Sequence, residues 1–167
     1  MKLTIFGATG GTGRQLVSQA LDAGHDVTAV VRDAARLPIR DERMRLVAGS
    51  MADPTTVSSA VQGADAVLSG LGARPKGIGI CSQGTRAIVD AMQAAALMED
   101  VLRDSGLDWT SVRPPRLTDK PLTGRYRTAI GRNVRRGYFL ARADLAHAML
   151  GTLDWSETLK QPLGVAY

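Results

Sequence analysis

Glycines at positions 7, 10 and 13 directly follow an apolar run at residues 2–6. Glycine allows a tight turn and lets backbone N–H groups approach phosphate oxygens closely. We expect Gly7 to form the turn, Gly10 to admit the phosphate, and Gly13 to let a following helix pack against the strand. That helix, expected at residues 12–23, would point its partly positive N-terminus at the anion. The spacing therefore predicts a site for a nucleotide pyrophosphate.

Two other interpretations fit a glycine turn: a structural turn without a ligand, and a mononucleotide-binding loop. The second needs a Gly-Lys-Ser/Thr ending whose lysine reaches the phosphates, whereas this turn ends Thr12-Gly13-Arg14. A second apolar run at residues 26–32 completes a strand–helix–strand unit. This context favours a dinucleotide over either alternative.

Arg32 stands at the end of the second apolar run, where an acidic residue would bind the ribose 2′-hydroxyl of NAD. A guanidinium can instead pair with the 2′-phosphate of NADP, which a carboxylate would repel. Arg36 and Arg14 could extend the same basic pocket. The alternatives are that Arg32 and Arg36 are solvated loop residues, or that Asp33 serves the 2′-hydroxyl. We expect NADP, with NAD possible.

The rest of the chain alternates strand and helix signals, which favours an α/β fold with a doubly wound parallel sheet. A helix at residues 54–61 has Asp53 as its N-cap and Pro54 at its first position. A strand at residues 108–113 ends at Pro114. The other expected elements are strands at 43–49 and 64–71, a ligand-facing loop at 72–79 and a last helix at 142–153.

Residues 82–105 do not fit this alternation. They are compatible with a single helix of about 24 residues and about 36 Å, about twice the length of a typical strand. The apolar stripe of that helix also breaks, because Ile88 and Met92 share a face while Leu97 lies on the opposite side. The pattern predicts two helices joined without the strand that should separate them. Either the protein lacks a strand–helix unit here, or the natural chain carries residues that this sequence does not.

The composition predicts one soluble domain spanning residues 1–167, with 44% hydrophobic and 22% charged residues. Met1 leads directly into a strand and no apolar run reaches ~18 residues, so we expect neither a signal peptide nor a membrane span. A single cysteine, Cys81, excludes an internal disulfide and suits the cytoplasm. His25 and His147 are the only histidines and lie far apart, so we expect no metal site.

The excess positive charge of the chain, +5 in total, is concentrated between residues 124 and 137. Three interpretations are open: a solvated hairpin that turns at Gly131 or Gly137, a pocket wall that attracts an acidic substrate, and a nucleic-acid surface. Nucleic acid is disfavoured because Tyr126 is the only aromatic residue in the run and no nucleic-acid-binding motif accompanies it. The arginines of this run are Arg125, Arg127, Arg132, Arg135 and Arg136.

A series of short motifs runs along nearly the whole chain. They are Phe6-Gly7-Ala8-Thr9-Gly10 through Gly13, Val31-Arg32-Asp33, Arg36-Leu37-Pro38, Leu71-Gly72-Ala73-Arg74, Val101-Leu102-Arg103-Asp104-Ser105-Gly106-Leu107, Arg113-Pro114-Pro115, Pro121-Leu122-Thr123-Gly124 with Tyr126, and Asp144-Leu145-Ala146-His147. In this order they resemble the atypical short-chain dehydrogenase/reductase group with an NmrA-like, NAD(P)H-binding domain. The resemblance is strongest to flavin reductases of the biliverdin reductase B type. It implies a single Rossmann-like domain.

The resemblance also implies a cofactor site. The residues that would hold the phosphates and ribose of NADP are Gly7, Thr9, Gly10, Gly11, Thr12, Arg32 and Arg36. Those that would line the cofactor or border its nicotinamide are Leu71, Gly72, Arg74, Pro114, Pro115, Arg116 and Leu117. The family usually binds adenine with an acidic residue after the third strand. This chain has Ser50-Met51 there, so we expect adenine to be held by backbone groups and Met51.

A larger departure from the family lies between Ala96 and Met98. The family's fifth strand, with a serine or threonine near the nicotinamide, should fall here and be followed by the substrate lid. Neither segment is present. We therefore expect a Rossmann-like domain without the fifth strand and lid, and no catalytic residue can be assigned.

The Tyr-x-x-x-Lys dyad of ordinary short-chain dehydrogenases is also absent, because Ile130 follows Tyr126 and Arg142 follows Tyr138 at that spacing. A tyrosine without the lysine is a poor general acid at neutral pH, which disfavours alcohol oxidation, dehydration and epimerisation. We expect an NADPH-dependent reductase that passes hydride to a small electron-poor acceptor such as a flavin or quinone. The arginines that could hold an acidic acceptor, or form salt bridges instead, are Arg74, Arg113 and Arg116. The alternative is a non-catalytic NADP-binding redox sensor or regulator.

Overall fold

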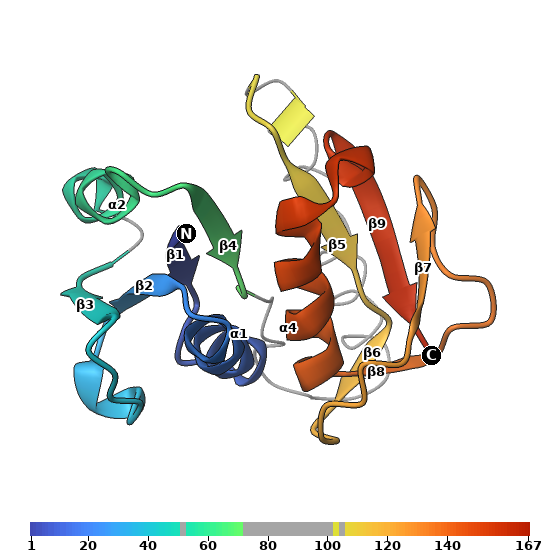
Figure 1. Ribbon diagram of the computed structural model, residues 1–167, viewed down its shortest axis with the longest axis horizontal. Helices are drawn as coiled ribbons and strands as arrows, with labels where there is room; N and C mark the ends of the chain where they lie inside the picture. The colour runs from blue at the N-terminus through green and yellow to red at the C-terminus, as the bar shows by residue number, and fades with distance from the viewer. Residues whose placement is uncertain (51–52, 72–101, 104–105) are drawn as a thin grey trace, which may run out of the picture.

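The N-terminal part of the chain alternates strands and helices, whereas the C-terminal part consists mainly of short strands and one helix (Figure 1). The computed structural model describes residues 1–50, 53–71, 102–103 and 106–167. The N-terminal elements are β1 (Lys2–Phe6), α1 (Gly11–Asp22), β2 (Asp26–Val31), the 3-10 helix η1 (Ala34–Arg36), β3 (Met44–Ala48), α2 (Pro54–Val61) and β4 (Ala66–Ser69). The C-terminal elements are β5 (Thr110–Arg113), β6 (Arg116–Thr118), β7 (Arg127–Ile130), β8 (Phe139–Ala141), α4 (Arg142–Gly151), the 3-10 helices η2 (Thr152–Asp154) and η3 (Ser156–Thr158), and β9 (Gln161–Ala166).

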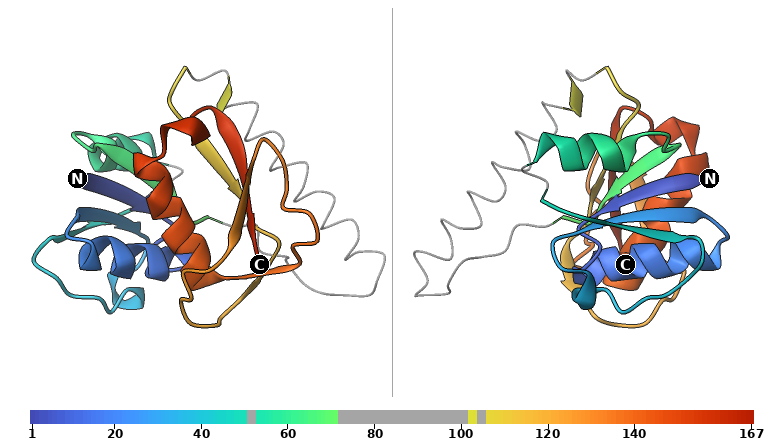
Figure 2. Two further views of the ribbon diagram at one scale, coloured as in Figure 1. Left: turned by 45° about the vertical axis from the view of Figure 1, so that its right-hand side comes forward. Right: turned by 90° about the vertical axis from the view of Figure 1, so that its left-hand side faces the viewer.

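The N-terminal strands form a parallel sheet in the order β3-β2-β1-β4. Successive side chains of β1 point to opposite faces of this sheet. Leu3 and Ile5 belong to the core that α1 covers. On the other face, Phe6 packs with Ala60 of α2, and the Thr4 hydroxyl donates to the Ala60 carbonyl (2.6 Å). Helices therefore cover both faces, with α1 and α2 on opposite sides (Figure 2), and the predicted doubly wound arrangement is confirmed.

The predicted cap of the helix at 54–61 is also confirmed. The Asp53 carboxylate accepts hydrogen bonds from the backbone N–H groups of Thr55 (3.1 Å) and Thr56 (3.2 Å), and from the Thr56 hydroxyl (2.6 Å). The Thr56 hydroxyl, followed by the Thr55 N–H, lowers the pKa of Asp53. These bonds satisfy N–H groups that the first turn of a helix leaves without partners.

The C-terminal strands pair differently from the sequence prediction. β7 pairs antiparallel with β9, with Ile130 opposite Leu163, and β8 pairs in parallel with β6. The hairpin predicted at residues 124–137 is therefore wrong, although Gly131 does form a turn after β7 with a φ of 75°. The partner of β7 is β9 because that strand carries the buried side chains Leu163 and Val165, which form the C-terminal core.

Helix α4 joins the two parts into one domain. Its Ala146 lies in the core beneath α1, while Leu145 and Ala148 belong to the C-terminal core. The Gln19 side-chain amide of α1 donates to the Ala143 carbonyl of α4 (3.0 Å). One helix thus contributes to both cores and holds them together.

The described strands do not form one continuous sheet. Within the described ranges, β4 pairs only with β1 and β5 pairs only with β9. The helix predicted at residues 82–105 and the junction near residue 97 lie outside the described residues, apart from the helical Leu102 and Arg103. No helix in the described part of the chain is long and apolar enough to cross a membrane.

Candidate functional site

The glycine turn between β1 and α1 is closely packed against its surroundings. Gly7 has a φ of 73°, in the left-handed region that favours glycine, and its carbonyl accepts a hydrogen bond from the Gly10 N–H (2.9 Å). A Cβ atom at Gly13 would lie 2.0 Å from the Gly7 carbonyl oxygen. Only a glycine at position 13 lets α1 approach the strand this closely.

The N-terminus of α1 offers backbone donors and no competing acceptor. Gly10 occupies the cap position, so no side chain caps the helix, and the first turn contains no acidic residue. The first N–H groups of a helix have no partners within it, and together with the helix dipole they favour an anion. The predicted threonines of this turn lie partly or largely inside the fold, with Thr9 half-buried and Thr12 buried.

The end of β4 lies next to the glycine turn. The Gly70 N–H donates to the Phe6 carbonyl (3.0 Å), and a Cβ atom at Gly7 would lie 3.0 Å from the Leu71 nitrogen. The Leu71 side chain is 53% exposed. The turn therefore stands between β1 and β4, where the strand order reverses, and this is the usual ligand position in doubly wound folds. Gly72 and Arg74, predicted to continue this edge, lie outside the described residues.

Basic side chains follow β2 at the same edge of the sheet. Arg32 comes directly after β2 and Arg36 ends η1; both are exposed, and neither guanidinium has a hydrogen-bond or ion-pair partner among the described residues. Arg14 of α1 donates to the Arg36 carbonyl (3.0 Å), which ties η1 to the start of α1. The Asp33 carboxylate accepts from the Ala35 N–H (3.0 Å) and caps η1. The Arg32 guanidinium is therefore more available to bind a ligand at this edge than the Asp33 carboxylate.

The predicted adenine region follows β3. Ser50 is exposed, and its carbonyl accepts a hydrogen bond from the Asp53 N–H (3.0 Å). Met51 lies outside the described residues. Because the strands are parallel, their carboxyl ends meet at one edge of the sheet. The predicted site residues that the structure brings to this edge are Gly7, Gly10, Gly11, Arg32, Arg36, Ser50 and Leu71.

The predicted nicotinamide residues belong to the C-terminal part. Pro114 and Pro115 are half-buried between β5 and β6, Arg116 is exposed on β6, and Leu117 packs against the C-terminal core. Arg113, predicted as an acceptor ligand, is half-buried on β5. They belong to the sheets β5-β9-β7 and β6-β8 rather than to the sheet of the glycine turn, and their place beside the nicotinamide stays a prediction.

Arg142 connects this segment to the glycine turn, and sequence reasoning missed it. Its guanidinium pairs with Asp119, just beyond β6 (2.7 Å). A Cβ atom at Gly11 would lie 2.6 Å from Cδ of Arg142, so the arginine side chain covers the start of α1. Arg142 is the first residue of α4 and carries no motif of its own, so only the packing of α4 against α1 reveals it.

Asp144, on the first turn of α4, organises the loop between β6 and β7. Its buried carboxylate accepts from the backbone N–H groups of Thr123 (3.0 Å) and Gly124 (2.7 Å), and from the hydroxyls of Thr123 (2.9 Å) and Tyr167 (2.5 Å). Burial by itself opposes ionisation, but these hydrogen bonds, the Tyr167 bond first, lower the pKa of Asp144. The motif residue Asp144 therefore holds the loop that contains the Pro121-Leu122-Thr123-Gly124 motif.

Tyr126 faces His147 of α4. The tyrosine hydroxyl and Nδ1 of His147 share a hydrogen bond of 2.6 Å, and the rings meet edge to face with centroids 5.8 Å apart. Burial, with a smaller contribution from the charge of Asp144, raises the pKa of Tyr126. Tyr126 is therefore protonated at neutral pH and lacks the lowered pKa of a dyad tyrosine.

A protein-family model described as NAD(P)H-binding matches this chain in two segments, residues 7–97 and 92–155. Together the segments cover well over half of the chain. They overlap at residues 92–97, so the break in the match falls where the sequence predicts a missing strand–helix unit.

Curated proteins and solved structures are also similar to the chain. The photosystem II assembly factor Ycf39 of Trieres chinensis is 34% identical over 100 residues, 57% of this chain and 31% of that protein. A (4-alkanoyl-5-oxo-2,5-dihydrofuran-3-yl)methyl phosphate reductase of Streptomyces griseus is 27% identical over 132 residues, 67% of this chain and 46% of that protein.

The structure of ChuY, an anaerobillin reductase from Escherichia coli O157:H7, has a TM-score of 0.81 at 21% identity and covers 99% of this chain and 97% of its own. That likeness confirms the Rossmann-like fold. The chain spans about a third or less of the length of the first curated relatives it matches.

Proposed function

Because the chain belongs to the NAD(P)H-binding family, we propose that it is an NADPH-dependent reductase that passes hydride to a flavin, quinone or related electron-poor small molecule. The observation that carries the proposal is the glycine turn at the reversal of strand order. Two guanidinium groups that have no partner among the described residues follow the neighbouring strand. A dinucleotide whose pyrophosphate is held at the turn and whose further phosphate lies near the end of β2 satisfies both features.

The glycine turn fits a dinucleotide pyrophosphate. A Cβ atom at Gly7 would come within 3.0 Å of the Gly70 and Leu71 backbone, and one at Gly13 would overlap the Gly7 carbonyl. The segments around the turn therefore approach one another so closely that only glycine fits at these positions. The N–H groups at the start of α1 remain available to phosphate oxygens.

NADP fits the end of β2 better than NAD. The exposed guanidinium of Arg32 follows β2 directly, and that of Arg36 follows in η1; neither has a partner in the part of the chain that the structure describes. Guanidinium groups bind phosphate through two parallel N–H bonds and carry a permanent charge. The carboxylate of the adjacent Asp33 is engaged in capping η1. We assign Arg32 and Arg36 to the 2′-phosphate.

The proposed hydride transfer needs little chemical participation by the side chains of the protein. NADPH, when bound, supplies the hydride. The chain orients the cofactor against the acceptor, a contribution that position alone can make large. Tyr126 has a raised pKa and its hydroxyl is held by His147, so we do not assign it as a general acid and take the proton from water. The reductase names of the Streptomyces griseus relative and of ChuY support this reaction class.

A non-catalytic NADP-binding regulator is the second candidate. The observation in its favour is the similarity to Ycf39, which is named an assembly factor. Both candidates use the same dinucleotide site, and they differ in whether hydride leaves it.

NADPH consumption separates the two candidates. The purified protein is first titrated with NADPH, and NADPH oxidation is then followed without oxygen in the presence of FMN, FAD or a quinone. We expect oxidation that depends on protein and acceptor. Tight NADPH binding without turnover on any acceptor would contradict the reductase and support the regulator.

A further inference from the structure

A groove lies where the end of β6, the segment before β8 and the end of β9 meet. Its volume is about 460 Å³. The residues that line it are Thr118, Lys120, Arg136, Tyr138, Phe139 and Tyr167. We call it the β6–β8 groove. Arg136 belongs to the arginine run for which a pocket wall was one interpretation of the sequence, and the set combines aromatic rings with cationic groups.

The aromatic wall of the groove is unusually exposed. Tyr138 is 69% exposed and Phe139 is 47% exposed. Both rings are therefore accessible to a ligand in the groove. Flat rings favour offset or edge-to-face contact with other rings, so this wall fits a planar ring system.

A third ring, that of Tyr167, is held in place. Its hydroxyl donates to Asp144 (2.5 Å) and accepts from the Ala141 N–H (3.2 Å). The backbone N–H of Tyr167 donates to the Phe139 carbonyl (3.1 Å), and the backbone carbonyl of Tyr167 accepts from the Arg127 guanidinium. One side of the groove is thus fixed before any ligand arrives, which lowers the entropic cost of binding.

Two cations in the groove have no anionic partner among the described residues. Neither Lys120 nor Arg136 forms a hydrogen bond or ion pair through its side-chain nitrogens with any described residue. The neighbouring carboxylate of Asp119 is already paired with Arg142. Arg136 also has a φ of 57°, a left-handed conformation that is costly for a residue with a side chain and is often retained at functional sites.

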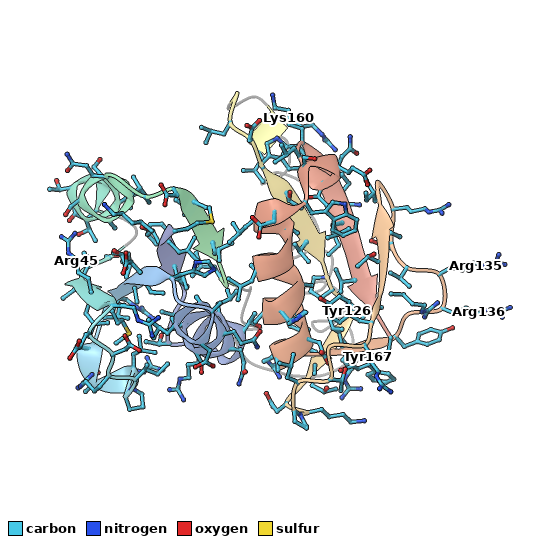
Figure 3. All side chains as sticks on the ribbon, viewed as in Figure 1. Arg45, Tyr126, Arg135, Arg136, Lys160 and Tyr167 are labelled. Carbon is cyan, nitrogen blue, oxygen red and sulfur yellow. The ribbon has the colours of Figure 1, made fainter. Side chains whose placement is uncertain are left out.

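The groove adjoins the glycine turn through one chain of contacts. Thr118 lines the groove, and the next residue, Asp119, pairs with Arg142, which covers Gly11. Figure 3 shows Arg136 on the segment between β7 and β8, and Tyr167 beside the foot of α4. This series of contacts links one wall of the groove to the start of α1 through the Arg142 side chain.

We propose that the β6–β8 groove binds the acceptor, a planar ring system that carries a phosphate or carboxylate. The rings lie against Tyr138 and Phe139, and the anionic group pairs with Lys120 and Arg136. The inference rests on the proposed function and deepens it, because it makes these two cations the residues that select anionic acceptors over neutral ones with the same rings.

FMN and riboflavin test the proposal, because they share one ring system and differ by a phosphate. Binding of each to the protein without NADPH is measured by flavin fluorescence, for the wild-type chain and for the double variant Lys120→Gln/Arg136→Gln. We expect the wild-type chain to bind FMN about tenfold more tightly than riboflavin, and the variant to bind the two equally. The control Arg132→Gln, an exposed arginine outside the groove, should behave as wild type.

A second variant tests the aromatic wall. Tyr138→Ala removes an exposed ring, so it should fold normally and weaken both flavins to a similar extent. Equal wild-type affinity for FMN and riboflavin, or an unchanged preference in the double variant, would overturn the proposal. Flavin binding as expected without NADPH oxidation would leave the groove assignment standing and contradict the proposed reductase instead.

Discussion

The two parts of this molecule pair their strands by different rules. In the N-terminal sheet, β1, β2 and β3 pair in sequence order, and each connection is a short crossover through a helix or loop. In the C-terminal part, β5 and β7 both pair with β9, and β6 pairs with β8 across the whole β7 segment. The N-terminal pairings are thus all parallel and follow repeated crossover connections, while the C-terminal part mixes parallel and antiparallel pairs.

The difference has a functional counterpart. The N-terminal edge presents backbone N–H groups and arginines, which suit a dinucleotide that many proteins share. The C-terminal part presents the β6–β8 groove, which combines aromatic rings with two cations. The two meet at α4, whose Arg142 reaches the glycine turn. We therefore propose that the first part selects the cofactor and the second selects the acceptor.

The largest expected effect comes from Gly13→Ala in the N-terminal part. The added Cβ would lie 2.0 Å from the Gly7 carbonyl oxygen, where only backbone can yield. We expect the free energy of unfolding to fall by about 3 kcal/mol or more, with loss of NADPH binding. Urea unfolding followed by circular dichroism measures the change.

Gly151→Ala is the matched control for that substitution. No atom lies within 4 Å of a Cβ built at Gly151, at the end of α4. Its free energy of unfolding should be unchanged or up to about 1 kcal/mol higher, because alanine is the better helix former. Equal stability of the two variants would show that the close approach at Gly13 does not exist.

The next effect, on the C-terminal part, comes from Asp144→Ala. The substitution leaves the donors of Thr123, Gly124 and Tyr167 without their buried acceptor. We expect the free energy of unfolding to fall by about 2–3 kcal/mol, while NADPH binding to the folded protein stays near wild type. A parallel loss of NADPH affinity would show that the two parts are not separable.

Asp144 also predicts a pH dependence. Its pKa is lowered in the folded chain, so its contribution is fully present above the unfolded carboxyl pKa of about 3.9 and is lost as pH falls through the lowered value. The difference in unfolding free energy between wild type and Asp144→Ala should therefore be constant from neutral pH to about pH 5 and shrink in more acidic solution. A difference in unfolding free energy that grows as the pH falls would contradict the lowered pKa of Asp144.

A smaller effect is expected from Arg142→Ala, at the junction of the two parts. Its partner Asp119 is largely exposed, with 88% of its side chain accessible, so the ion pair contributes only about 0.5–1 kcal/mol. NADPH affinity should fall a few-fold because a cation beside the pyrophosphate position is lost, and added salt should reduce the difference. Calorimetric titration at low and high salt measures both changes.

Much of the N-terminal part could be predicted from sequence. The alternation of apolar residues, the glycines and the Asp53 cap each act through neighbours in the chain, and the structure places β1, α1, β2, β3, α2 and β4 within a few residues of the expected bounds. The C-terminal strands were harder to predict from the sequence. β6, β8 and β9 were not expected, and the hairpin interpretation of residues 124–137 is wrong. β6 and β8 are only 3 residues long, too short for an alternating pattern, and the pairing of β7 with β9 depends on packing around Leu163 and Val165.

The candidate site divides in the same way. The glycine turn and Arg32 could be found because strand, turn and helix are contiguous. Arg142 and the β6–β8 groove could not, because Arg142 faces Gly11 only through the packing of α4 on α1, and the groove is lined from three separate segments. A strained residue such as Arg136 has no sequence signal, since its left-handed φ is visible only in the fold.

The affinities of NADPH and NADH for wild type and for Arg32→Glu show whether the edge after β2 binds a 2′-phosphate. Arg45→Glu, an equal charge change at an exposed position on β3 (Figure 3), is the control. Calorimetric titration should show that Arg32→Glu weakens NADPH by about tenfold or more while NADH changes little, and that the control changes neither. Equal losses for the two dinucleotides in Arg32→Glu would contradict the assignment.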